Sequence, residues 1–168
     1  VKRVSTNYDE EGNVRQQWVI QEQEKEHLEE QIRGLVSGFC EDIKGKSKKR
    51  KFSGKSNKQL MSAYVMGDAH IGMRAWGIET GSADFDVEIA TQDIRNAIDH
   101  LVESSPESEV GLLVNVGDAL HIDDSTNMTP HGKNQLDADS RWQYVMKSAG
   151  IVFKYCIDKM LTKHKKVV

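Results

Sequence analysis

The spacing of apolar and polar residues changes several times along the chain. From residue 61 onward, segments with the spacing of a strand alternate with segments with the spacing of a helix. Residues 110–116 (VGLLVNV) are almost continuously apolar, which is typical of a strand buried on both faces. The full pattern predicts strands at 62–66 and 110–116, helices at 86–103 and 139–163, and a last strand beginning in 165–168. Strands that alternate with helices join through crossovers into a parallel sheet, so we expect an α/β fold of βαβαβ order.

The first 60 residues follow another pattern. Residues 2–8 and 14–20 alternate as the two strands of a hairpin, and residues 22–40 carry apolar side chains at helical spacing. Residues 43–60 are rich in Lys, Ser and Gly and have too few apolar side chains to form a core. The sequence therefore predicts a hairpin-helix appendage at 1–42, a basic flexible linker at 43–60 and an α/β domain at 61–168.

Composition argues against a membrane protein. The hydrophobic fraction of 38% and the charged fraction of 29% are ordinary for a globular domain. No 18 apolar residues follow one another, and the start of the chain lacks the apolar core of a signal peptide. Cys40 and Cys156 form no CxxC pair, so we expect both thiols to stay reduced in the cytoplasm.

The net charge of −3 hides a basic segment. Residues 44–58 hold eight Lys or Arg and no acidic residue. Such a segment either is a solvated linker or binds the phosphates of nucleic acid without regard to sequence. Phe52 is its one aromatic residue, too little for a base-stacking platform. The run Gly54-Lys55-Ser56 is no phosphate-binding loop, because Lys49 occupies the place of the first glycine and no strand precedes it.

Two predicted strands end in the same dipeptide, Gly-Asp. Asp68 and His70 follow the first strand, and Asp118 and His121 follow the second. Ligands of open α/β sheets bind beyond the carboxyl ends of the strands, so these side chains meet if the two strands are neighbours. Carboxylate oxygens together with neutral imidazoles suit Mn²⁺, Fe²⁺ or Zn²⁺ better than Ca²⁺. The alternative is a pair of unrelated structural turns.

These two segments carry a resemblance to a known family. Residues 67–70 (GDAH) resemble the first motif, D-x-H, of the calcineurin-like metallophosphoesterases, and residues 117–121 (GDALH) resemble the second, GD-x-x-D/H. The closing His121 is similar to SbcD-type DNA repair nucleases, where protein phosphatases usually have Asp. The stretch from the first motif to the second also resembles phage and prophage metallophosphoesterases. The resemblance covers about residues 60–168.

The resemblance implies a metallophosphoesterase sandwich with two divalent metal ions, Mn²⁺ before Fe²⁺ or Zn²⁺. Asp68 and His70 would hold the first ion, and Asp118 would bridge both. His121 would be the catalytic residue that contacts the phosphate or assists the leaving group, unless it is a surface loop residue. Two such ions polarise a phosphoryl oxygen and lower the pKa of a water molecule for in-line attack.

The long segment 119–137 would border the substrate cleft by the same resemblance, and loops of this length are often functional. It contains Asp123, Asp124 and His131, which we interpret as solvated loop residues rather than as ligands.

The chain departs from the family after the second motif. An Asn-His pair following a third strand and two later His-containing strand ends are part of the family pattern and do not occur in residues 1–168. His164 is no substitute, because it precedes that strand. The resemblance therefore implies the front part of a longer enzyme, and we expect residues 1–168 alone to bind at most one metal ion weakly and to hydrolyse little.

The predicted activity is metal-dependent hydrolysis of phosphate esters, with DNA phosphodiesters as the favoured substrate because His121 and the basic segment 44–58 both point to it. A phosphomonoesterase or protein phosphatase on the same metal centre is the first alternative. The second is a non-catalytic module or inactive fragment that binds nucleic acid or protein. A phage-encoded enzyme would work in the cytoplasm of the bacterial host. The oligomeric state is open.

Overall fold

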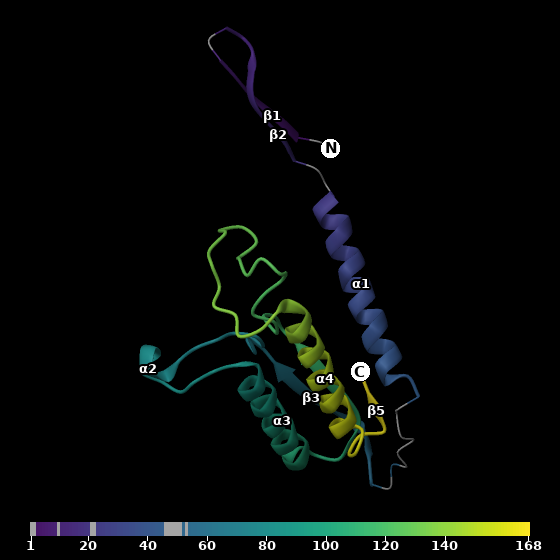
Figure 1. Cartoon of the computed structure of the whole chain (residues 1–168). Coiled ribbons are helices and arrows are strands. Elements are labelled where there is room, and N and C mark those ends of the chain that lie inside the picture. The colour runs from purple at the N-terminus through teal and green to yellow at the C-terminus, as the bar shows by residue number, and fades with distance from the viewer. Residues whose placement is uncertain (1–2, 10, 21–22, 46–51, 53) are drawn as a thin grey trace. The chain divides into compact units, whose positions relative to one another are not determined.

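Residues 3–9, 11–20, 23–45, 52 and 54–168 are described by a computed structural model of the chain (Figure 1). Some predicted features lie partly outside these residues, namely the first residues of the hairpin and of the first helix, and positions 46–51 and 53 of the basic segment. The chain divides into two units, Val1–Asp42 and Ile43–Val168. Each unit is described by itself.

The first unit contains the predicted hairpin and helix. Strands β1 (Arg3–Tyr8) and β2 (Val14–Ile20) pair antiparallel. Asp9 organises the turn between them, because its Oδ1 accepts the backbone N–H of Asn13 at 2.8 Å. Helix α1 (Gln23–Ile43) runs three residues beyond the predicted end at residue 40.

The second unit is built on a parallel sheet. Strands β3 (Asn57–Met66), β4 (Ser108–Asn115) and β5 (Lys166–Val167) lie in the order β3-β4-β5, and both pairs are parallel. Ala63 lies opposite Leu112 in the register of the first pair. The prediction of a mixed α/β fold with a parallel sheet is confirmed at this level.

The predicted start of the first strand of this sheet is wrong. Strand β3 begins at Asn57 and not at residue 62, so residues 57–60 belong to the sheet and not to the basic linker 43–60. The backbone N–H of Asn57 donates to the carbonyl of Glu107 at 2.8 Å. Strand pairing uses backbone groups, which the polar side chains of this exposed strand end do not block.

Three helices belong to the second unit. The short α2 (Gly77–Thr80) was not predicted, whereas α3 (Val87–Ser104) and α4 (Trp142–Met160) were. Helix α4 is shorter at both ends than the predicted 139–163. Asp86 caps α3, because its Oδ1 accepts the backbone N–H of Ile89 at 2.8 Å. In the described part of the chain no helix is long and apolar enough to cross a membrane.

The core of this unit lies between the sheet and the two long helices, which run side by side in Figure 1. It contains Tyr64 of β3, together with buried residues of α3 and α4: Ile98, Val102, Cys156 and Met160. Both cysteines are free, and burial raises the pKa of the Cys156 thiol to about 11. This thiol is therefore a packing group and not a nucleophile.

A buried histidine joins the ends of several elements. His164 is 1% exposed, and its Nε2 lies 2.6 Å from the hydroxyl oxygen of Tyr64. Its Nδ1 donates to the carbonyl of Ser108 at 2.9 Å, while the Tyr64 hydroxyl also lies 2.7 Å from Ser105 Oγ. These bonds connect four places in the chain: Tyr64 of β3, Ser105 directly after α3, Ser108 at the start of β4, and His164 shortly before β5. His164 thus has a structural role.

Gly111 of β4 provides the space for this histidine. A Cβ at that position would lie 2.7 Å from His164 Cδ2 and 3.0 Å from Met160 Cε. We expect Gly111→Ala to lower the free energy of unfolding by about 1–3 kcal/mol through overpacking, measured by urea denaturation. The control is Gly38→Ala in α1, where a Cβ meets nothing within 4 Å and no loss is expected. Equal urea midpoints for Gly111→Ala and the wild type would contradict the packing argument.

Candidate metal centre

Two turns at the carboxyl edge of the sheet lie against each other. Strands β3 and β4 are parallel neighbours, so the turns that follow them share one edge of the sheet. The pairing continues beyond the strands, because the backbone N–H of Asp68 donates to Gly117 O at 3.3 Å and that of His70 donates to Asp118 O at 2.9 Å. The two Gly-Asp segments are therefore positioned by backbone hydrogen bonds.

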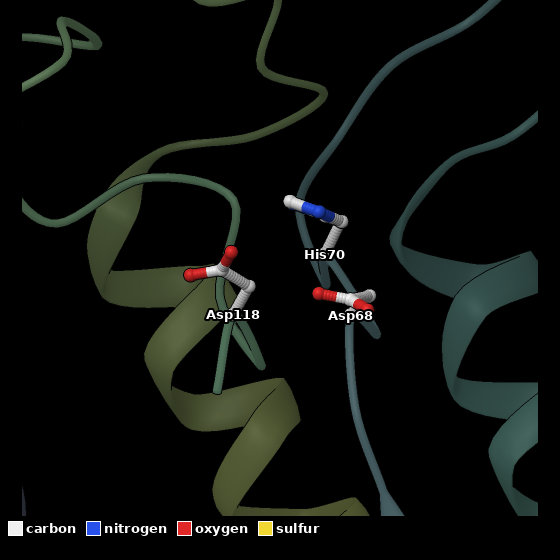
Figure 2. A group of neighbouring side chains, drawn as sticks. All are labelled: Asp68, His70 and Asp118. Atoms are coloured by element: carbon white, nitrogen blue, oxygen red, sulfur yellow. The ribbon is translucent and has the colours of Figure 1, made fainter. Parts of the chain in front are cut away.

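The side chains of Asp68, His70 and Asp118 converge at this edge. Each offers one ligand atom, and these atoms all lie within 4.8 Å of one another. Figure 2 shows Asp118 on one loop facing Asp68 and His70 on the other. The structure thus brings together the three residues that the sequence predicted as metal ligands.

All three residues have an unusual backbone conformation. The φ angles are +51° at Asp68, +41° at His70 and +43° at Asp118. In the described part of the chain, Asn127 and Lys133 are the other non-glycine residues with positive φ. Non-glycine residues seldom adopt the left-handed region, although Asp, Asn and His do so more often than others, and residues in this conformation concentrate at functional sites. This clustering supports a site more strongly than the side-chain types do.

The two glycines that precede the aspartates differ in their roles. Gly117 has φ +135°, a conformation that favours glycine. Gly67 has no positive φ, but a Cβ there would come within 2.8 Å of Val116 Cγ2. Gly117 therefore allows the backbone to turn after β4, whereas Gly67 allows the two loops to approach each other.

The chemistry of this group fits a divalent metal ion. His70 Nδ1 is buried and has no hydrogen-bond partner among the residues that the structure describes. A buried polar atom without a partner needs an explanation, and a ligand is one. The Asp68 and Asp118 residues are exposed, so an ion between them would be open to a substrate. Two carboxylates and an imidazole form a donor set for Mn²⁺, Fe²⁺ or Zn²⁺. The group could hold a metal ion.

His121 lies beside this group. Its ring centroid is 5.6 Å from that of His70, with an angle of 70° between the ring planes. Burial lowers the pKa of His121 most, and the neighbouring His70 lowers it further, while Asp137 opposes both effects. The neutral imidazole is thereby favoured, with one nitrogen able to accept a hydrogen bond or a proton.

The other polar residues of segment 119–137 lie outside the three-residue group. Thr126 donates to the Asp124 carboxylate from its hydroxyl and from its backbone N–H, which lowers the pKa of Asp124. Asp123 and His131 are exposed. Among the described residues neither aspartate belongs to the group that could hold a metal, and the same is true of His131.

Asp137 is a neighbour of the site that the sequence did not reveal. Its charge acts on His121, and its carbonyl accepts the backbone N–H of Arg74 at 2.9 Å. The loop that leads away from His70 is thus tied to the segment before α4. Asp137 follows no strand and belongs to no motif, so only the folded chain brings it close.

Comparison of the chain with protein families, curated proteins and solved structures gives no match.

Replacing one ligand should weaken metal binding. We expect Asp118→Asn to weaken Mn²⁺ binding by more than about 10–100-fold. Loss of a residue that only hydrogen-bonds to a metal ligand already weakens binding by about that factor, and loss of the ligand itself should weaken it further. Calorimetric titration of the chelator-treated chain with Mn²⁺ measures this. Asp123→Asn is the matched control, because it removes an exposed carboxylate of the neighbouring loop and should leave the affinity unchanged. Equal affinities of the two variants would refute the assignment.

Relieving the backbone strain should separate stability from metal binding. In chelator we expect Asp118→Gly to raise the free energy of unfolding by about 1 kcal/mol, because glycine adopts φ +43° without strain. The same variant should lose Mn²⁺ affinity. Lys133→Gly, at φ +52°, should gain similar stability and keep its affinity. Denaturation and titration of both variants test this, and a less stable Asp118→Gly would show that strain is not stored at the site.

Proposed function

We propose that this chain carries the metal centre of a calcineurin-like metallophosphoesterase, an enzyme that hydrolyses phosphate esters with divalent metal ions. The observation that carries the proposal is the convergence of Asp68, His70 and Asp118 within 4.8 Å, at the carboxyl ends of adjacent parallel strands. The βαβαβ order of the second unit supports the start of the family's sandwich. The strained backbone at all three residues supports a site kept for chemistry.

The proposed centre uses two divalent ions, with Mn²⁺ first among the candidates. Asp68 and His70 would hold one ion, and Asp118 would be shared between the two. When bound, the ions supply positive charge for the phosphoryl oxygens and make a water molecule more acidic. The three side chains set the position of that charge, and the backbone bonds between the two loops keep the side chains in place.

His121 is the proposed catalytic residue. Its neutral form, favoured by burial and by His70, accepts a proton or a hydrogen bond at one ring nitrogen and donates at the other. Beside His70 it can contact a phosphate oxygen held at the centre, or the leaving group. Asp137 partly opposes the lowering of the pKa of His121.

DNA is the favoured substrate class. The similarity of residues 117–121 to the second motif of DNA repair nucleases supports a phosphodiester. Exposed Lys55 and Lys58, in the described part of the basic segment 44–58, support contact with a phosphate backbone. Two free cysteines agree with work in a reducing cytoplasm.

The test compares three substrates in the presence of Mn²⁺: single-stranded DNA, a phosphopeptide and p-nitrophenyl phosphate. We expect slow cleavage of the DNA, since three ligands are assembled among the described residues. Cleavage should be lost in Asp118→Asn and kept in Asp123→Asn. His121→Gln should lower turnover by roughly 10²–10⁴-fold, the usual contribution of a general acid or base, without changing Mn²⁺ affinity.

The other outcomes assign the alternatives. Hydrolysis of the phosphopeptide or of p-nitrophenyl phosphate in preference to DNA would indicate a phosphatase on the same centre. DNA binding that is equal in the wild type and in Asp118→Asn, with no hydrolysis of any substrate, would indicate a binding module and overturn the proposal.

A further inference from the structure

The loop between the first Gly-Asp turn and α3 carries an exposed tryptophan. This loop, residues 73–86, contains the short α2, and in Figure 1 it extends away from α3 and α4. Trp76, directly before α2, is 48% exposed, whereas Trp142 of α4 is 2% exposed. Tryptophans are enriched at binding surfaces, because the ring offers a large apolar face to a partner. The exposed ring of Trp76 is therefore a candidate contact.

The backbone on both sides of Trp76 is fixed by hydrogen bonds. Ala75 and Phe85 exchange two of them, each at 2.9 Å. The backbone N–H of Gly77 donates to Asp84 Oδ1 at 2.7 Å, which closes the loop a second time. The indole is thus carried on an ordered turn, so a ligand that contacts it does not have to order the loop first.

The start of this loop is joined to the candidate metal centre. The backbone N–H of Met73 donates to the carbonyl of His70 at 2.9 Å, and that of Arg74 donates to the carbonyl of Asp137 at 2.9 Å. Trp76 follows His70 closely in the sequence, so even a fully extended chain would separate their Cα atoms by at most about 22 Å. A single strand of a few nucleotides spans such a distance.

Arg74 places a positive charge on one face of the ring. Its guanidinium carbon lies 4.7 Å from the centroid of the Trp76 ring. Arg74 is exposed and is the one Lys or Arg of the loop, and within the described part of the chain no carboxylate pairs with it. Asp84 and Asp86, two of the acidic residues of the loop, accept backbone N–H groups instead. The guanidinium is therefore able to donate to a phosphate.

We propose that Trp76 stacks a base of a single-stranded DNA substrate and that Arg74 contacts the adjoining phosphate. An aromatic face together with a cation for the backbone is the combination that sites for single-stranded nucleic acid use. Because the guanidinium covers one face of the ring, the base would lie on the other. The stacking is indifferent to sequence, since every base has a π face. The inference rests on the proposed function for its substrate, and it adds a binding site beside the metal centre.

The experiment measures the binding of labelled oligothymidine to the whole chain in chelator by fluorescence anisotropy, next to an abasic strand of the same length. The wild type should prefer oligothymidine. Trp76→Ala should weaken oligothymidine binding by about 5–150-fold, the effect of one lost stack, and leave the affinity for the abasic strand unchanged. Trp76→Tyr should restore most of that loss. Arg74→Ala should weaken both strands and reduce the salt slope by about 1.

Ile78→Ala is the matched control. Ile78 is 93% exposed in the same loop and is apolar without being aromatic, so its loss should leave both affinities unchanged. Circular dichroism of each variant checks that it is folded like the wild type.

Three results would overturn the inference. The first is equal oligothymidine affinity of the wild type and Trp76→Ala, which includes the case that neither binds. The second is an equal loss for both strands in Trp76→Ala, which would indicate a changed loop and not a lost stack. The third is an equal loss in Trp76→Ala and Ile78→Ala, which would indicate an apolar surface for a protein.

The measurement contains no metal ion, so its failure is distinct from failure of the proposed function. Trp76-dependent binding of bases without Mn²⁺-dependent cleavage would refute the hydrolysis and keep the binding site. Cleavage of DNA with no effect of Trp76→Ala on binding would refute the binding site and keep the hydrolysis.

Discussion

The parallel pairing of β3 with β4 is the interaction on which the candidate site depends. It brings the carboxyl ends of two strands, separated by α2 and α3 in the sequence, to the same edge of the sheet. The hydrogen bonds continue past the strand ends into both Gly-Asp turns, up to the bond between Ile71 N and Ala119 O at 2.9 Å. A slip of one residue in this register would turn the side chains of a strand to the other face. Burial of Tyr64 on one face opposes that slip, so the core also fixes the geometry of the ligands.

A second constraint acts at the other end of the domain. His164, Tyr64 and Ser108 form a polar junction without solvent, and buried polar groups of this kind are stable only when all are paired. Lys163 adds to it, because its Nζ donates to the carbonyls of Val102 at 2.8 Å and Glu103 at 3.0 Å in the last turn of α3. The junction sets where α3 and α4 end relative to β4.

The sequence predicted what depends on local pattern and missed what depends on tertiary structure. Apolar periodicity located the strands near 62–66 and 110–116 and the long helices, and the two motifs located the three side chains that converge. The early start of β3 at Asn57 was missed because polar residues can pair through their backbone when a neighbour such as Glu107 is present. The proximity of Asp137 to His121 was missed because it arises between loops. The left-handed backbone at the aspartates was also not predicted, because it depends on how the two loops pair through Asp68 N and His70 N and not on a local pattern.

That last feature bears most directly on function. Three residues of one small group adopt the left-handed region, a concentration of backbone strain that is typical of functional sites. Two exposed carboxylates within 4.8 Å of each other add repulsion when no cation lies between them. Glycine or asparagine would satisfy the same turns at lower cost, as Asn127 does at φ +53° in the neighbouring loop. A cation held by the three side chains would offset the repulsion, with the His70 imidazole as its nitrogen ligand. Backbone strain and negative charge therefore coincide at a group of three side chains that could hold a metal ion.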